Sequence, residues 1–423
     1  MLPNSSRTYH DPLHGAITLD SSDPVEALLI QLIDTSAFQR LRRIRQLGPA
    51  SVTFHGAEGS RFTHSLGVMA VARRVFDRLM RRYPQLQPHR AVVLCAALLH
   101  DIGHGPFSHT SEEIFGNHHE LWTQRILEES ETIHRLLTSF EATLIRRIQA
   151  VYEKQYPVPL VWQLVTSQLD CDRLDYLMRD SYFTGASYGK LDLDRILLAM
   201  NYDPVSQQLV VAHKGMAAIE HYLVVRYFMY AQVYNHPKNL AATWLLTQAF
   251  HRAKEQLAQG QALEVDATVQ AWLTQDCNHL ALEHYLSADD VVFNYHLHRW
   301  QSSSDGLLAD FCRRLLDRDL LKAMNVTHLT EIQQQELLQQ TAPLLTQAGL
   351  VPHCYAGLRE TLSRGYTLYQ KGIKLQSEGG LREISHLSPL VKTLTQPVQQ
   401  VWLLYPAEVE AEVMRVVHSK ALT

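Results

Sequence analysis

The interpretation of the whole sequence depends on one stretch, Leu99-His100-Asp101-Ile102-Gly103-His104-Gly105-Pro106-Phe107-Ser108-His109. It ends the apolar run over residues 91–99, so the His100-Asp101 doublet stands at the end of a predicted buried helix. We expect Gly103 to break that helix and let the two side chains converge on one ion. A His-Asp doublet alone is common by chance, and its meaning depends on what accompanies it.

Two further segments supply groups of the same kind. Arg61-Phe62-Thr63-His64-Ser65 precedes the doublet, and Asp170-Cys171-Asp172-Arg173-Leu174-Asp175-Tyr176 follows it. The predicted ligands are two imidazoles and two carboxylates, from His64, His100, Asp101 and Asp172. Such a mixed set suits a borderline divalent ion (Zn, Mn, Fe or Ni) and leaves positions for water and a phosphate oxygen. For any one of these residues alone, a capping or core polar role would be the favoured interpretation, but not for the whole set.

The fold class predicted from the hydrophobic pattern is all-α with small β-hairpins. Asp23 before Pro24 is an N-cap signal, and Pro88 opens another predicted helix. Helical periodicity covers residues 24–34, 65–83, 88–99, 119–128, 172–180, 216–234 and 240–257, and strand-like stretches cover 15–19 and 208–213. Chemical motifs become sparse after Gly260. We therefore expect an N-terminal hairpin with helices over residues 1–50, a helical core over 51–260 and a mostly helical C-terminal lobe over 261–423.

The composition excludes several classes of protein. The chain has 423 residues, of which 46% are hydrophobic, which is enough for a large core. Its longest apolar run is far shorter than the ~20 residues of a membrane helix, so we expect a cytoplasmic protein without a membrane partner. Five scattered cysteines suggest neither a disulfide framework nor a cysteine-based zinc site. The net charge of -4 disfavours a nucleic-acid partner, although basic segments at residues 40–45 and 73–82 leave one open.

The order and spacing of these motifs resemble the HD superfamily of metal-dependent phosphohydrolases. Flanking segments are similar to its deoxynucleoside triphosphate (dNTP) triphosphohydrolase branch. They are His10-Asp11-Pro12-Leu13-His14-Gly15, Phe38-Gln39-Arg40-Leu41, Gln46-Leu47-Gly48 and Tyr234-Asn235-His236. The resemblance covers roughly the first 240 residues, where several separated motifs agree. It implies an HD-domain helical core, with His64, His100, Asp101 and Asp172 as metal ligands.

The resemblance also implies catalytic roles. His104, His109 and His119 match histidines that line the cleaved phosphate, and the His119-Glu120 pair resembles the catalytic dyad of the family. An imidazole, which titrates near neutral pH, can give a proton to a departing 5'-oxygen, while a neighbouring carboxylate, either Glu120 or Glu112, fixes its tautomer. The competing interpretation of His119 is a polar helix start.

Further matches imply a substrate-binding set. The triphosphate would be bound by Arg61, Arg173 and Arg226, with Arg173 replacing the usual lysine and so changing the donor geometry. The 3'-hydroxyl would be contacted by Gln46, Tyr176 and Asp180, and a ribose 2'-hydroxyl would be excluded by Leu47 and Tyr234. Ordinary core packing is the alternative for the two tyrosines. Mg²⁺ accompanying the triphosphate is a further cofactor that this interpretation allows.

A regulatory site is the last implication of the resemblance. Arg7, Asp34, Gln39 and Arg42 match positions where relatives bind an activating guanine nucleotide, GTP or dGTP, between the subunits of a homo-oligomer. A carboxylate can accept hydrogen bonds from the N1 and N2 donors of guanine, and arginines can bind its triphosphate. The alternative is that Asp34 only ends a helix and that the arginines lie on a solvated face. The expected homo-oligomer is a dimer or a tetramer.

The leading hypothesis is therefore hydrolysis of a dNTP to deoxynucleoside and inorganic triphosphate, through attack of metal-activated water on the α-phosphorus, and allosteric regulation is a separate expectation. The enzymatic alternative is another HD phosphohydrolase, either a nucleotidase or a phosphodiesterase for cyclic or alarmone nucleotides. A non-catalytic nucleotide sensor or single-stranded nucleic-acid binder is the third hypothesis. No predicted metal ligand is missing from the sequence, which favours an enzyme.

Overall fold

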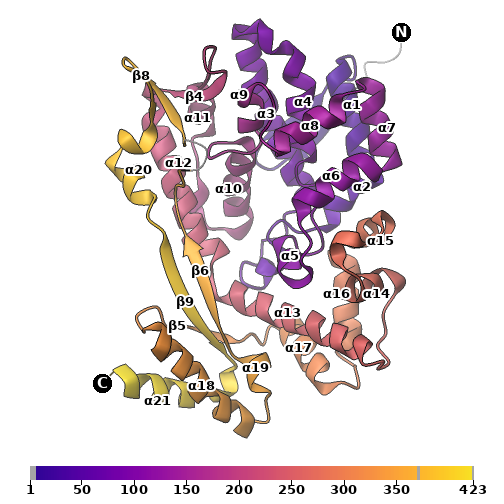
Figure 1. Ribbon diagram of the computed structural model, residues 1–423, viewed down its shortest axis with the longest axis vertical. Coiled ribbons are helices and arrows are strands. Elements are labelled where there is room, and N and C mark those ends of the chain that lie inside the picture. The colour runs from indigo at the N-terminus through magenta and orange to yellow at the C-terminus, as the bar shows by residue number, and fades with distance from the viewer. Residues whose placement is uncertain (1–5, 369–371, 422–423) are drawn as a thin grey trace.

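A computed structural model describes residues 6–368 and 372–421 of the chain. Helices make up most of this part, and short strands form small sheets beside them (Figure 1). The helices of the first half are α1 (Pro24–Ile33), α2 (Ser36–Gln39), α3 (Arg61–Arg82), α4 (Arg90–Leu99), α5 (His109–Phe115), α6 (His119–Glu129), α7 (Glu131–Phe140), α8 (Leu144–Tyr152), α9 (Pro159–Gln163), α10 (Cys171–Thr184), α11 (Leu193–Ala199) and α12 (Met216–Met229). Those that follow are α13 (Pro237–Ala258), α14 (Ala267–Thr274), α15 (Leu282–Ser287), α16 (Asp290–Trp300), α17 (Gly306–Leu316), α18 (Glu331–Gln347), α19 (Pro352–Tyr355), α20 (Pro389–Leu394) and α21 (Glu410–Ala421).

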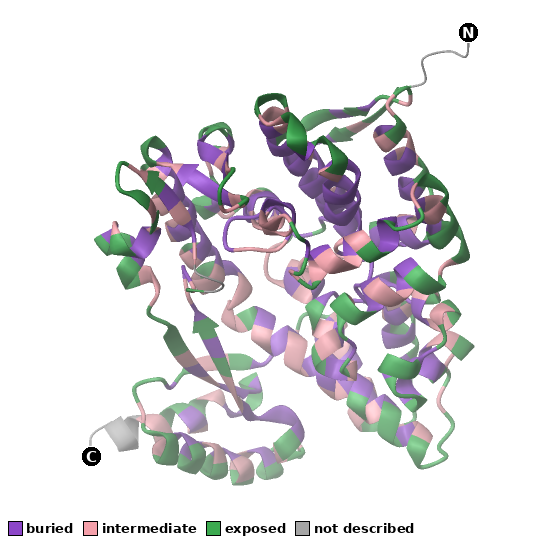
Figure 2. Cartoon of the chain, turned by 45° about the horizontal axis from the view of Figure 1, so that its top comes forward, coloured by how far each residue is buried: buried purple, intermediate pink, exposed green. Residues whose placement is uncertain are grey.

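The first core is built around α3, which packs against both α4 and α10. Every residue of α4 is buried, which explains why its sequence has no polar face (Figure 2). The other two helices start at defined caps: Ser60 accepts the backbone N–H of Thr63, and Asp170 accepts that of Arg173 at 2.8 Å. This packing brings the first turns of α3 and α10 to the C-terminal end of α4.

The N-terminal hairpin packs against this core. Strands β1 (Arg7–Asp11) and β2 (Gly15–Leu19) are antiparallel, with Arg7 opposite Leu19 and Asp11 opposite Gly15. Gly15 has a φ of +68°, which glycine adopts without steric cost at this turn. The turn delivers Asp11 and His14 to α10, where their side chains reach Asp175 and Arg179.

A second cluster of buried side chains lies around α13, α14, α16 and α17. It also includes Phe107, Ile114 and Trp122 from the first half of the chain. Strands β5 (Lys322–Asn325), β6 (Gly357–Ser363) and β9 (Val398–Tyr405) form a sheet in the order β5-β9-β6, and β6 and β9 extend together toward α20 (Figure 1). The remaining sheet has the order β3 (Met200–Asp203), β4 (Gln208–Ala212), β7 (Lys374–Ser377) and β8 (Gly380–Glu383). The parallel pairing of β4 with β7 returns the C-terminal region to the first half of the chain.

The structure confirms the predicted all-α class with small β-hairpins, and each predicted helix and strand has a counterpart. Several helix boundaries differ from the predicted ones. The helix predicted over 65–83 begins at Arg61, and the helix predicted over 172–180 extends to Thr184. The helix predicted from residue 88 begins at Arg90, because residues 84–89 form a 3₁₀ turn, and the helix predicted over 216–234 becomes a π-turn at Tyr230–Tyr234. The domain boundaries remain predictions. None of the helices that the structure describes combines the length and the hydropathy that a membrane-spanning segment requires.

Candidate active site

Four predicted metal ligands from three helix ends converge in the first core. His64 Nε2 lies 3.1 Å from Asp172 Oδ1 and 3.3 Å from His100 Nε2. Asp101 completes the set, with Oδ1 3.3 Å from His100 Nε2 and Oδ2 3.5 Å from His64 Nε2. Donor atoms that share one ion at about 2.1 Å lie roughly 3 Å apart, so these separations fit a single divalent ion. The residues present therefore fit the metal that the sequence predicts.

Side chains behind the ligands fix the orientation of the His64 ring. His64 Nδ1 lies 2.7 Å from Asp175 Oδ2, which also accepts a hydrogen bond from Arg179 Nε. His14 Nε2 contacts the other oxygen of this carboxylate at 2.6 Å, and Arg179 extends the network to Asp11 at 2.8 Å. With Nδ1 engaged as a donor, the lone pair of Nε2 faces the other ligands, as metal binding requires.

This supporting network was not predicted from the sequence. Asp175 stands three residues after Asp172 on α10, a spacing that places both carboxylates near one face of the helix. Asp11 and His14 lie in the segment that carried the family resemblance. His100 is oriented in a simpler way, because its Nδ1–H donates to the Ala97 carbonyl oxygen at 2.9 Å.

The charges around the four predicted ligands favour a positive charge between them. Burial lowers the pKa of His64, but hydrogen bonds to Asp172 and Asp175 outweigh it and raise the pKa to about 10. The pKa of Asp101 is held well below its usual range despite burial, because the Arg61 guanidinium lies beside it. Two ionised carboxylates around two imidazoles are an environment in which a divalent cation is stabilised.

Gly103 has a different role from the one predicted. Helix α4 ends at Leu99 with His100 as its C-cap, so the helix stops before the glycine. A Cβ on Gly103 would lie 2.1 Å from the His119 carbonyl oxygen and 2.3 Å from the Thr123 backbone nitrogen. The glycine is therefore needed for the close approach of α6, which brings His119 to the site.

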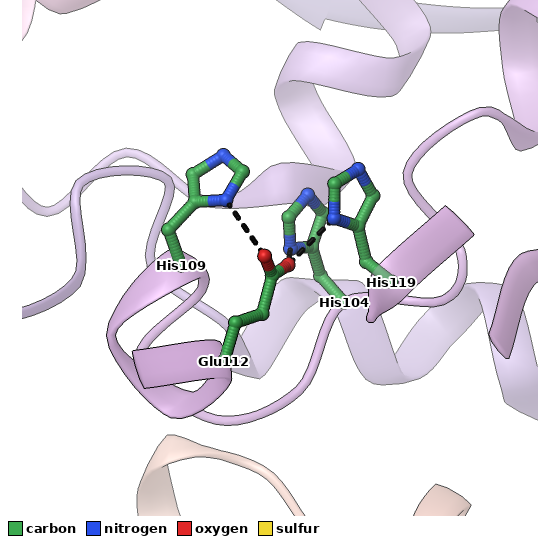
Figure 3. A group of neighbouring side chains, drawn as sticks. All are labelled: His104, His109, Glu112 and His119. Atoms are coloured by element: carbon green, nitrogen blue, oxygen red, sulfur yellow. Dashed lines mark hydrogen bonds and ion pairs between the residues drawn. The ribbon is translucent and has the colours of Figure 1, made fainter. Parts of the chain in front are cut away.

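Three histidines surround one carboxylate next to the metal ligands (Figure 3). His119 Nδ1 lies 2.5 Å from Glu112 Oε1, and His109 Nδ1 lies 3.4 Å from Glu112 Oε2. The ring of His104 stacks on that of His119, with centroids 3.9 Å apart and planes 11° apart. Of the two carboxylates considered for His119, Glu112 is the one in contact, whereas Glu120 lines the cavity.

The geometry of this histidine group is better suited to protons and phosphate oxygens than to a second metal ion. Imidazole lone pairs lie in the ring plane, so the stacked rings of His104 and His119 cannot both point at one ion between them. Burial, together with the charge of Arg61, keeps the pKa of His104 well below its usual value. The pKa of Glu112 is lowered despite burial by its hydrogen bonds with His109 and His119, so Glu112 is ionised at neutral pH.

A cavity of about 430 Å³ connects the metal ligands with the histidine group. Its volume is in the range of small-molecule sites. Predicted residues that line it are Gln46, Leu47, Arg61, His100, Asp101, His104, His109, His119, Glu120, Asp172, Arg173, Tyr176, Asp180 and Tyr234. Lining residues that the sequence did not indicate are Thr123, Gln124, Tyr152, Val165, Thr166 and Tyr230.

The three predicted phosphate-binding arginines differ in position. Arg61 Nη1 contacts Asp101 at 2.5 Å, and its Nε donates to Ser108 Oγ at 2.7 Å. Arg173 pairs with Asp170 at the start of α10. Arg226 is not among the described residues that line the cavity, because its guanidinium is buried and donates to Gln168 at 2.8 Å.

Asp180 and the tyrosines form another part of the wall. The Tyr234 hydroxyl donates to Asp180 Oδ2 at 2.9 Å, and the ring of Tyr234 meets that of Tyr176 edge to face. Burial raises the pKa of Asp180 to about 7, although the hydrogen bond from Tyr234 opposes this. Tyr230 and Tyr234 stand in the π-turn after α12, and such turns are frequent at functional sites.

The predicted regulatory residues lie on the surface near the N-terminal hairpin. Arg7 Nη1 lies 2.5 Å from Asp34 Oδ1, with both side chains about half exposed. Arg42 donates to Gln39 Oε1 at 2.7 Å, and its guanidinium lies 3.5 Å from the centre of the Phe62 ring. The four predicted residues thus form two pairs, Arg7 with Asp34 and Arg42 with Gln39.

Comparisons with known proteins agree with this architecture. Residues 61–176 match the HD domain, and residues 191–346 match the HD associated region. The uncharacterized protein YwfO of Bacillus subtilis is 35% identical over 401 residues, which cover 93% of this chain and 90% of that protein. A phosphohydrolase structure from Bacteroides thetaiotaomicron has a TM-score of 0.83 at 28% identity and covers 95% of this chain and 99% of its own.

A more distant relative carries a functional name. The deoxynucleoside triphosphate triphosphohydrolase SAMHD1 homolog of Dictyostelium discoideum is 30% identical over 277 residues, which are 62% of this chain. The match spans about half, 52%, of that relative. The chain belongs to the HD superfamily of phosphohydrolases, and it resembles the dNTP triphosphohydrolase branch.

Proposed function

We propose that the protein hydrolyses dNTPs to deoxynucleoside and inorganic triphosphate. The observation that carries the proposal is one cavity lined by metal ligands, by the histidine group around Glu112 and by the Asp180-Tyr234 pair. In this order, these groups could polarise the bonds at a phosphorus, protonate a leaving oxygen and contact a sugar. The names of the SAMHD1 relatives support the same choice.

The metal would be held by His64, His100, Asp101 and Asp172. A divalent ion bound there supplies Lewis-acid polarisation of a phosphoryl oxygen and lowers the pKa of a coordinated water. Arg61 holds Asp101 in place by an ion pair and faces the same cavity, so it can also neutralise phosphate charge.

His119 is the proposed proton donor. As water attacks the α-phosphorus, a new oxygen-phosphorus bond forms and the bond to the 5'-oxygen breaks. The 5'-oxygen takes a proton from the protonated imidazole, and the proton that the water releases passes to solvent, from which the imidazole is protonated again. Glu112, ionised and 2.5 Å from Nδ1, fixes the tautomer and stabilises the charged ring before transfer. The stacked, neutral His104 provides a fixed surface for the donor ring.

The wall of Leu47 and Tyr234 is proposed to exclude a ribose 2'-hydroxyl, while Asp180, Tyr176 and Gln46 contact the 3'-hydroxyl. Packing alone gives modest selectivity, about 10–200-fold for a small group, so the preference for deoxy substrates depends on how closely the wall fits.

The test is product analysis. Metal-supplemented protein is incubated with each dNTP and the matching ribonucleotide, and the products are separated. Inorganic triphosphate together with deoxynucleoside supports the proposal. Orthophosphate release would indicate a nucleotidase instead, opening of cyclic or alarmone nucleotides without dNTP turnover would indicate a phosphodiesterase, and binding without turnover would indicate a sensor.

We further propose that Arg7, Asp34, Gln39 and Arg42 bind GTP or dGTP in a homo-oligomer. A nucleotide that binds only the assembled state must also promote assembly, so activity on a single dNTP should rise when GTP is added. Asp34→Ala should blunt that rise without changing metal content. Full activity without added nucleotide, together with an oligomer unchanged by GTP, would refute this regulatory site and leave the catalytic proposal intact.

A further inference from the structure

The loop that carries His104 and His109 has an unusual backbone. Phe107 and Ser108 both have left-handed φ values, +59° and +58°, although neither is glycine. Phe107 is also bulky and buried, with its ring among Phe250 and Phe293. Non-glycine residues keep such a conformation only where their surroundings hold them there. The contacts that hold this loop therefore bear on where its histidines lie.

Asp290, the first residue of α16, holds the strained part of the loop. Its Oδ1 accepts the backbone N–H of Phe107 at 2.7 Å, and its Oδ2 accepts the backbone N–H of Arg45 at 2.9 Å. The carboxyl is almost fully buried, with 4% of the residue exposed. Ser108 Oγ closes the same junction by donating to the Arg45 carbonyl oxygen at 2.5 Å. One carboxylate thus ties the loop to the segment that precedes Gln46 in the cavity wall.

The beginning of the loop is held from the same side. Arg40, also fully buried, donates to the carbonyl oxygens of Ile102 at 3.0 Å and His104 at 2.8 Å. Those two bonds come from Nη2, and Nη1 of Arg40 donates to the carbonyl oxygen of Ala288 at 3.0 Å. Ala288 stands two residues before Asp290. The Tyr285 hydroxyl donates to the Gly103 carbonyl oxygen at 2.6 Å. Residues 285–290 lie within the HD associated region, outside the motifs that supply the ligands.

We infer that residues 285–290 position the histidine loop, with Asp290 as the residue that fixes its backbone at Phe107. The metal ligands His64 and Asp172 lie on α3 and α10 and have no need of this contact. Loss of the Asp290 hydrogen bonds should therefore displace His104 and His109 while the metal remains bound. Displacements of about 1 Å can reduce turnover by ~10²-fold, because the reacting groups lose their alignment. The inference rests on the proposed function only for its kinetic readout.

The test uses Asp290→Asn in the full-length, metal-loaded protein. The amide has nearly the same shape but only one acceptor oxygen, so it leaves one buried backbone N–H facing an NH₂ group. We expect unchanged metal content, a KM within about twofold of wild type and a kcat at least ~10-fold lower. Tyr285→Phe, which removes one hydroxyl, should lower kcat in the same direction by less.

The matched control is Asp266→Asn. Asp266 caps α14 in the same region and accepts the backbone N–H of Val269 at 2.8 Å, but it has no contact with the loop among the described residues. Its kcat should equal that of the wild type. If both variants lose thermal stability while kcat per metal-loaded molecule is unchanged in both, Asp290 has only a structural role and the inference is wrong.

A second readout does not depend on turnover. In protein labelled at histidine, the imidazole resonances of His104 and His109 should shift in Asp290→Asn, while those of His64 and His100 with bound metal should not. Unchanged resonances of the two loop histidines would overturn the inference. If the wild type hydrolyses no dNTP, the proposed function fails, but this measurement still decides whether Asp290 positions the loop.

Discussion

Gly67, in the middle of α3, offers a sharp test of the network behind His64. Alanine in a helix interior is normally favoured over glycine by about 0.5–1 kcal/mol. Here an added Cβ would lie 2.0 Å from Asp175 Oδ1 and 2.5 Å from Arg179 Nη2, whereas ordinary contact begins at 3.4 Å. Neither partner is free to move, because both are fully buried and bonded to His64, His14 and Asp11.

The overlap therefore outweighs the gain in helix propensity. Overpacking of this kind costs about 1–3 kcal/mol, so we expect Gly67→Ala to lower the free energy of unfolding. It should also weaken metal binding by about 10–100-fold, as expected when the partner of a ligating histidine is displaced. Metal affinity is measured by competition with a chromophoric chelator, and stability by denaturant unfolding of the metal-free protein.

Gly306→Ala provides the control. Gly306 opens α17, and a Cβ there would meet nothing within 4 Å, so this variant should keep wild-type metal affinity and equal or slightly higher stability. A Gly67→Ala protein with wild-type stability and wild-type metal affinity would refute the reasoning, because Asp175 would then not need its observed position.

Three further predictions concern individual site residues. Asp101→Ala should lose the bound metal and all hydrolysis, as measured by elemental analysis and product formation; a metal-replete, active variant would contradict the ligand assignment. His119→Ala should keep the metal but lose ~10²-fold or more in kcat, and near-normal turnover would move the proton donor elsewhere, with His109 next in line. Because burial raises the pKa of Asp180 to about 7, the carboxyl is mostly protonated below that pH and mostly ionised above it. If the ionised form accepts the sugar hydroxyl, kcat/KM should rise with pH through about 7, and Asp180→Asn should remove that step. An identical pH profile in the variant would count against this contact.

The structure brings together the four residues that the motifs and the family resemblance predict as metal ligands. His64, His100, Asp101 and Asp172 stand at or next to helix ends, and the packing of α3, α4 and α10 brings them together. The apolar run that ends at Leu99 predicted the end of α4, whereas the caps Ser60 and Asp170 of the other two helices were not predicted. Tyr176, Asp180 and Tyr234 line the cavity for the same reason, since they lie on α10 and just after α12. Residues that lie on or next to regular helices could therefore be assigned to the cavity wall from the sequence.

Other parts of the site depend on contacts that no local pattern encodes. The choice between Glu112 and Glu120 depends on how α5 folds back onto α6, which adjacency in the sequence cannot reveal. Arg226 follows the family pattern, yet Gln168 holds its side chain, and a partner 58 positions away cannot be read from periodicity. The strands β5 and β9 were likewise missed, because their pairing joins segments far apart in the chain.

The two chemical groups of the site depend on different parts of the molecule. The metal ligands are supported by α3, α4 and α10 and by the network through Asp175, all within the first core. The histidine group belongs to the connection that packs into the second core through Phe107, Ile114 and Trp122 and that Asp290 fixes. If the proposed roles hold, a change in the second core should alter proton donation while metal binding is preserved. The associated region contacts the histidine loop and contains none of the predicted metal ligands, so we expect it to affect the proposed proton donation alone.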